Sequence, residues 1–202
     1  MKFAKSIIGT AIALALSAAT LPAQATMIYN LDQTAVGAFG TAPYGSVTLD
    51  DSAAGIITVR VDLFNGFNFV DTGSHHAFGF NLDMGSYLLA LISPITGYTA
   101  NSGSFTQSGF GAYNRWFDCV ACGNGASSPV PPPLVFSVTG AGLTVNSFIA
   151  NSNGFRFSAD VFGNGATGPI ANGGTATVPE PGTLALLGLG LAGLSFIRRR
   201  KV

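Results

Sequence analysis

Hydrophobic and polar side chains alternate along several short stretches of the chain, which is the pattern of half-buried β-strands. The stretch GIITVRVDLF is the clearest case, with apolar side chains at every second position from 57 to 63. HHAFGFNLD (75–83) and FRFSADVF (155–162) repeat the pattern, and the latter predicts that Ser158 and Asp160 point to solvent. PLVFSVTG (133–140) and GSVTLDD (45–51) predict further strands.

Turn signals separate these strands. Asn-Gly pairs at 65–66, 124–125, 153–154 and 164–165 supply the positive φ angles that tight turns need. The more uniformly apolar SYLLALIS (86–93) predicts either a buried central strand or a short helix. We therefore expect an all-β fold, a single antiparallel, jelly-roll-like β-sandwich over residues 26–162, with a barrel as the alternative. GNGATGPIANGGTAT (163–177) has no periodicity and is expected to be a flexible linker.

Charge is scarce and segregated, with 9% charged residues against 48% hydrophobic ones. Residues 26–177 hold eight aspartates, three arginines and no lysine, whereas both termini are basic. Because binding to nucleic acid depends on neutralising phosphates with basic side chains, the acidic body argues against that function.

The N-terminal residues 1–25 have the three parts of a secretory signal peptide. Lys2 and Lys5 precede an apolar stretch at 7–19, and Ala23 and Ala25 form a small-x-small site for signal peptidase. The secretory translocon and signal peptidase are thus expected partners, and the mature chain is expected to begin at Thr26.

The C-terminal residues 178–202 also have three parts. The extended motif consists of Val178, Pro179, Glu180 and Pro181. Residues 183–197 carry no charge and predict a short transmembrane helix of about 22 Å, a marginal span for a hydrocarbon core of about 30 Å. The basic tail keeps the end of the chain cytoplasmic and consists of Arg198, Arg199, Arg200 and Lys201.

This C-terminal arrangement resembles the PEP-CTERM sorting signal. The resemblance implies recognition by exosortase, an integral-membrane protease of Gram-negative bacteria that removes the tail. It also implies an inner-membrane-anchored precursor that moves to the cell surface or extracellular matrix, in hosts that make exopolysaccharide and biofilm. A permanent tail anchor is the alternative.

Cys119 and Cys122 are the only cysteines of the chain. An even count in an exported protein favours a disulfide, which here would pin a loop. A redox site, a metal site and free thiols are the alternatives, although a zinc site would need two further ligands.

Catalytic motifs are scarce. The only glutamate is Glu180 in the sorting motif, so a hydrolase with paired carboxylates would have to use aspartates. Asp71 and His75 have a spacing that could supply two metal ligands, but the adjacent His75 and His76 are expected to point in opposite directions. We therefore predict no enzyme, no cofactor and no metal.

Aromatic side chains offer a binding site instead. Tyr98, Tyr113 and Trp116 lie in or beside a Ser/Gly-rich region and could stack on sugars, or could simply be core residues. The sequence predicts an exported, non-enzymatic surface or matrix protein associated with exopolysaccharide. A carbohydrate-binding module is the first alternative, and a secreted aspartate-based hydrolase is the second.

Overall fold

The structure is a computed structural model that describes residues 26–83, 85–123, 125–174 and 176–177. Strands and short 3-10 turns make up all regular structure of these residues, so the all-β prediction is confirmed. The strands are β1 (Thr26–Thr34), β2 (Gly45–Ala53), β3 (Ile56–Leu63), β4 (Asn68–Asp71), β5 (Phe78–Phe80), β6 (Leu88–Ser93), β7 (Thr99–Gln107), β8 (Gly111–Asp118), β9 (Gly125–Val130), β10 (Leu134–Thr139), β11 (Phe157–Gly163) and β12 (Ala166–Asn172). The 3-10 turns are η1 (Gly37–Phe39), η2 (Val120–Cys122) and η3 (Val145–Ser147).

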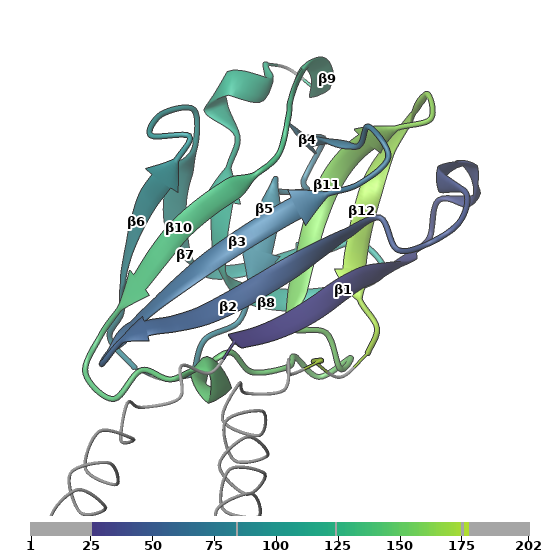
Figure 1. Cartoon of the computed structure of the whole chain (residues 1–202). Coiled ribbons are helices and arrows are strands. Elements are labelled where there is room, and N and C mark those ends of the chain that lie inside the picture. Colours follow the sequence, from purple (N-terminus) through teal and green to yellow (C-terminus); the bar gives the residue numbers. More distant parts are fainter. Residues whose placement is uncertain (1–25, 84, 124, 175, 178–202) are drawn as a thin grey trace, which may run out of the picture. The chain divides into compact units, whose positions relative to one another are not determined.

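All twelve strands belong to one antiparallel sheet. Its order is β6-β10-β3-β2-β1-β12-β11-β5-β8-β7, and β4 joins β11 to β9 outside this path. In Figure 1, β6, β10, β3, β2 and β1 lie in front of β5, β7, β8 and β11. The predicted antiparallel pairing is confirmed, but the two halves are joined through the β1–β12 pair into one nearly closed sheet.

The core fills the space between these two halves. Strand β3 shows the predicted alternation, with Ile57, Val59 and Val61 fully buried and Arg60 exposed. Phenylalanines from both halves meet around Phe136 of β10, whose ring centroid lies 4.6 Å from that of Phe117 and 5.3 Å from that of Phe80. These contacts hold the front and back strands together, because the hydrophobic effect favours removing both apolar faces from water.

Strand β12 corrects the linker prediction for 163–177. Residues Ala166–Asn172 form a strand between β1 and β11, and Ile170 is fully buried. Asn164 and Gly165 have φ angles of 51° and 77°, so they form the turn of a β11–β12 hairpin. The hairpin pairing, rather than any alternation within the strand, places this segment in the sheet.

Strand β11 also differs from the sequence prediction. Ser158 and Asp160 were expected to face solvent, yet both are fully buried. Asp160 is covered by the segment that follows β4, where Thr72 donates both its backbone N–H and its hydroxyl to Asp160 Oδ2. Strand β11 therefore has both of its faces covered.

SYLLALIS forms an edge strand rather than a central strand or a helix. Strand β6 pairs only with β10, at one end of the sheet. Leu88 remains 76% exposed and Ile92 47% exposed. A uniformly apolar run therefore does not mark the centre of this sheet.

The described ranges contain no helix that is long and apolar enough to span a membrane. The predicted signal peptide (1–25), sorting motif (178–181), apolar helix (183–197) and basic tail (198–201) lie outside the described residues.

The aromatic core predicts a large loss of stability when Phe136 is truncated. We expect Phe136→Ala to lower the free energy of unfolding by about 3–5 kcal/mol, because it removes ring contacts and leaves a cavity. Phe64→Ala is the matched control, since Phe64 is 36% exposed and its loss is expected to cost a small fraction of that value. Urea denaturation measures both, and equal losses would contradict the central role of Phe136.

Candidate functional site

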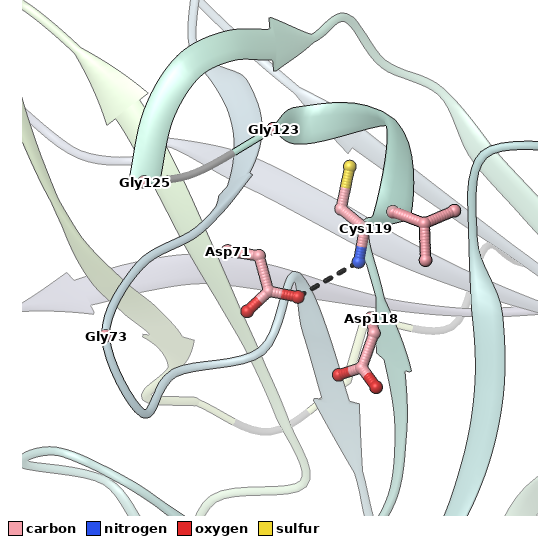
Figure 2. Close-up of a pocket in the computed structure, with 7 residues that line it drawn as sticks. Asp71, Gly73, Asp118, Cys119, Gly123 and Gly125 are labelled. Atoms are coloured by element: carbon pink, nitrogen blue, oxygen red, sulfur yellow. Dashed lines mark hydrogen bonds between the residues drawn. The ribbon is translucent and has the colours of Figure 1, made fainter.

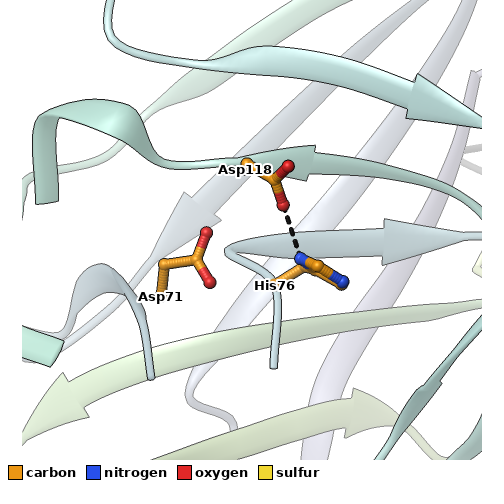
Figure 3. Close-up of side chains that lie close together, drawn as sticks. All are labelled: Asp71, His76 and Asp118. Carbon is orange, nitrogen blue, oxygen red and sulfur yellow. Dashed lines mark ion pairs between the residues drawn. The ribbon is translucent and has the colours of Figure 1, made fainter. Parts of the chain in front are cut away.

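Three ionisable side chains meet near one end of the sheet. Asp71 is the last residue of β4, Asp118 is the last residue of β8, and His76 lies in the loop before β5. One ligand atom from each lies within 4.8 Å of the other two. Figure 3 shows the two carboxylates and the imidazole pointing toward a common space.

Strand pairing creates this meeting. Phe78 of β5 pairs with Phe117 of β8, which brings the preceding loop of β5 beside Asp118. Asp71 pairs with Gly125 at the start of β9. The site is therefore assembled from segments far apart in the sequence.

The Cys119–Cys122 disulfide forms one wall of the site. The predicted bond is present, with an S–S distance of 1.96 Å. The backbone N–H of Cys119 donates to Asp71 Oδ2 at 3.0 Å, as shown in Figure 2. The disulfide loop thus fixes the Asp71 carboxylate, and both cysteines of the chain are in the bonded form.

A pocket of about 350 Å³ opens beside the two carboxylates. Its lining residues are Asp71, Gly73, Asp118, Cys119, Val120, Gly123 and Gly125 (Figure 2). Because glycines form much of the wall, the pocket offers backbone and carboxylate groups rather than an aromatic surface.

Asp118 and His76 face each other. His76 Nδ1 lies 2.5 Å from Asp118 Oδ1, and Asn101 donates to the other carboxylate oxygen of Asp118 at 2.8 Å. The imidazole stacks on Trp116, with ring centroids 5.1 Å apart, and packs edge-on against Phe105. These ring contacts hold the imidazole toward the carboxylates.

His75 has a different partner. Its Nδ1 lies 3.7 Å from Asp160 Oδ1, whereas His76 faces Asp118. The expectation that the adjacent histidines point to different places is confirmed. The spacing of Asp71 and His75 allowed two metal ligands, but the histidine that joins Asp71 in the cluster is His76.

The three aromatic candidates do not form an open platform. Tyr98 and Tyr113 are 6% and 1% exposed, so both are core residues. Trp116 is half-buried and its ring stacks on His76. Of the three, only Trp116 has a partly accessible side chain.

Burial shapes the electrostatics of the aspartates. Burial raises the pKa of Asp160 above its ordinary value, although the hydrogen bonds from Thr72 act in the opposite direction. Burial also raises the pKa of Asp71, opposed by the hydrogen bond from Cys119. Both carboxyl groups therefore hold a proton more tightly than an exposed aspartate does.

The sequence offered little to reveal the cluster. From the sequence, Asp71 is a possible ligand only together with His75, and Asp118 lies at the end of a strand, where aspartate is common for backbone reasons. The missing information was the β5–β8 pairing, which brings His76 to Asp118. Asp118 directly before Cys119 was the one available signal, since a disulfide loop fixes its neighbours.

The sorting residues and the signal-peptidase site lie outside the described residues. They are Val178, Pro179, Glu180, Pro181, Arg198, Arg199, Arg200 and Lys201 for sorting, and Ala23 and Ala25 for signal peptidase. Thr177, the residue directly before the motif, is nevertheless among the described residues. Thr177 and Ile28 exchange two backbone hydrogen bonds of 2.9 and 3.0 Å. Thr177, directly before the motif, thus forms an isolated bridge to β1.

Comparison with known proteins identifies the C-terminal segment. The family model of the PEP-CTERM protein-sorting motif matches residues 177–201. No curated protein and no solved structure matches the chain. The chain carries a PEP-CTERM motif, which is the signal of an exported, membrane-anchored precursor that exosortase processes.

The raised pKa of Asp160 predicts a pH-dependent stability. A folded state that holds this proton more tightly than the unfolded chain loses relative stability as pH rises from the ordinary aspartate value of about 3.9 through the folded pKa. Asp160→Asn should flatten this fall, because an amide does not titrate in this range, and its oxygen can still accept the bonds from Thr72. Urea denaturation across this pH range measures the slope.

Asp50→Asn is the control for loss of one carboxylate, since Asp50 lies in β2 away from this buried position. A slope that is unchanged in Asp160→Asn would contradict the prediction.

Proposed function

We propose that this chain is a non-enzymatic surface or extracellular-matrix protein that associates with exopolysaccharide after exosortase has processed it. The observation that carries the proposal is the PEP-CTERM motif at residues 177–201, attached to a compact β-domain. A signal of this kind directs the domain out of the cell, so its partners are to be sought there.

The junction between domain and motif supports release of an intact domain. Thr177 is hydrogen-bonded to Ile28, and Glu180 follows three positions later. Cleavage near the Pro-Glu-Pro motif would therefore remove the tail without cutting a strand of the sheet. The disulfide is compatible with the oxidising surroundings of an exported protein.

The carbohydrate-binding alternative rests on fewer residues than the sequence suggested. Tyr98 and Tyr113 belong to the core, so Trp116 is the remaining aromatic candidate. Its contacts with His76 and Phe105 already engage the indole ring. Association with polysaccharide through hydrogen bonds over a wider surface is the simpler proposal.

The hydrolase alternative is favoured by one observation. Asp71 and Asp118 present carboxylate oxygens within 4.8 Å of each other beside a pocket, and paired carboxylates are the machinery of glycoside hydrolysis. Against this role, His76 lies 2.5 Å from Asp118 and occupies the space at that carboxylate. We therefore keep the non-enzymatic proposal.

Processing by exosortase predicts a defined extracellular form. We expect the protein recovered outside the host to begin at Thr26, to end near Pro181, and to be about 2 Da lighter than the reduced chain because of its disulfide. Replacing Pro179, Glu180 and Pro181 by alanine should leave the whole tail through Val202 on a membrane-bound chain. Intact-mass analysis of the host fractions distinguishes the two forms.

Thr183→Ala is the matched control, because it changes the tail outside the tripeptide. Recovery of the unaltered chain with its full tail in a host that contains exosortase would contradict processing and favour a permanent tail anchor.

The non-enzymatic proposal predicts binding without cleavage. Incubated with the exopolysaccharide of its host, the full chain should co-sediment with the polymer and release no new reducing ends. Asp71→Asn and Asp118→Asn should behave like the unaltered chain. Release of reducing ends that either variant abolishes would establish the hydrolase instead.

Trp116→Ala separates the binding alternatives in the same experiment. Unchanged co-sedimentation supports a dispersed contact, whereas its loss in a folded variant would establish an aromatic carbohydrate site.

A further inference from the structure

We propose that Asp71, His76 and Asp118 form a binding site for a divalent transition-metal cation, with Zn²⁺ as the best fit. This goes beyond the proposed function, and it differs from the expectation of no metal stated in the sequence analysis. The three side chains supply two carboxylate oxygens and one imidazole nitrogen, all within 4.8 Å of one another.

The positions of the ligand atoms fit a shared ion. Ligands at about 2.1 Å from a tetrahedral Zn²⁺ lie about 3.4 Å apart. His76 Nδ1 and Asp118 Oδ1 lie 2.5 Å apart, so this pair would have to separate, and all three ligand atoms lie within 4.8 Å of one another. Small side-chain rotations would bring all three atoms to coordination distance.

The close approach of His76 to Asp118 does not have the form of a hydrogen bond. The two atoms lie 2.5 Å apart, yet both lack a hydrogen-bond partner of suitable geometry. An N–H···O bond is usually 2.7–3.2 Å long and nearly linear. Both atoms are buried, and a cation shared with Asp71 would give each of them the partner that it lacks.

The negative charge of the two carboxylates also favours a bound cation. Two carboxylates share the site, and like charges at this distance repel each other. In the part of the chain that the structure describes, no arginine or lysine forms an ion pair with either one, since Arg60 pairs with Asp62. A bound dication would neutralise both carboxylates at once.

Surrounding contacts orient each ligand through atoms that do not face the site. Cys119 N–H holds Asp71 Oδ2, and Asn101 holds Asp118 Oδ2. The stack on Trp116 fixes the plane of the His76 ring. Such outer contacts are typical of metal sites, where they fix the direction of the coordinating atoms.

The donor set selects the class of metal. Imidazole nitrogen suits Zn²⁺ and its transition-metal neighbours, whereas Ca²⁺ and Mg²⁺ prefer oxygen alone. Three protein ligands leave the fourth position of Zn²⁺ for a solvent molecule, and the neighbouring pocket has room for it.

The test is calorimetric titration of the full, untagged, oxidised chain in detergent with ZnCl₂, after chelation and dialysis. We expect one Zn²⁺ per chain, with Ca²⁺ binding more weakly. His76→Gln and Asp118→Asn should each weaken binding by at least about 10–100-fold, the loss that removal of outer contacts alone can cause. Co²⁺ in place of Zn²⁺ should give the visible absorption of a low-coordinate site in the unaltered chain only.

His75→Gln is the matched control, because His75 is the adjacent histidine with similar exposure but faces Asp160. It should bind Zn²⁺ like the unaltered chain. Equal loss in both histidine variants, absence of a single Zn²⁺ site in the unaltered chain, or stronger binding of Ca²⁺ than of Zn²⁺ would each overturn the proposal.

Thermal unfolding without metal distinguishes the site from a purely structural ion pair. Asp118→Asn removes one of two repelling charges, so the metal-free variant should melt at the same temperature as the unaltered chain or higher. Zn²⁺ should then raise the melting temperature of the unaltered chain alone. A lower melting temperature of the metal-free variant, with no effect of Zn²⁺ on either protein, would show that Asp118 serves only to hold His76.

Discussion

The rest of this structure depends on one constraint, the burial of aromatic rings between the two halves of the sheet. Phe136 on β10 contacts Phe80 and Phe117 on β5 and β8, strands that are distant from β10 in the sheet order. Backbone hydrogen bonds link neighbouring strands only, so these ring contacts determine that the sheet folds over itself. With β5 and β8 fixed in this way, the residues directly before β5 and at the end of β8 are brought close together.

The ionisable cluster is a consequence of that closure. Asp118 and His76 flank the paired residues Phe117 and Phe78, whose rings lie in the core. The core side chains therefore set the distance between the polar ones just outside it. The disulfide adds a second restraint, since Cys119 follows Asp118 and its backbone N–H holds Asp71.

The alternation of apolar and polar residues predicted the strands well where one face is buried and the other is exposed to solvent. Strand β3 follows its alternation residue by residue. The pattern failed for β11, because Asp160 is covered by the chain around Thr72, 88 positions away in sequence. It also failed for β12, where Gly168 and Pro169 interrupt the alternation. The Asn164–Gly165 turn before β12 is nevertheless a hairpin signal. The residues next to a position in the sequence do not indicate whether a distant segment of the chain will bury it.

The sequence by itself determined the strands with clear alternation, such as β3 and β10, the cysteine pair and the exported character of the protein. Each of these follows from local order: side-chain alternation, two cysteines three positions apart, and a motif of consecutive residues at 177–201. Only the tertiary structure decided which carboxylates meet a histidine and which tyrosines enter the core. Those outcomes depend on strand pairing, because Asp71 and the backbone of Cys119 come into contact across 48 positions of sequence.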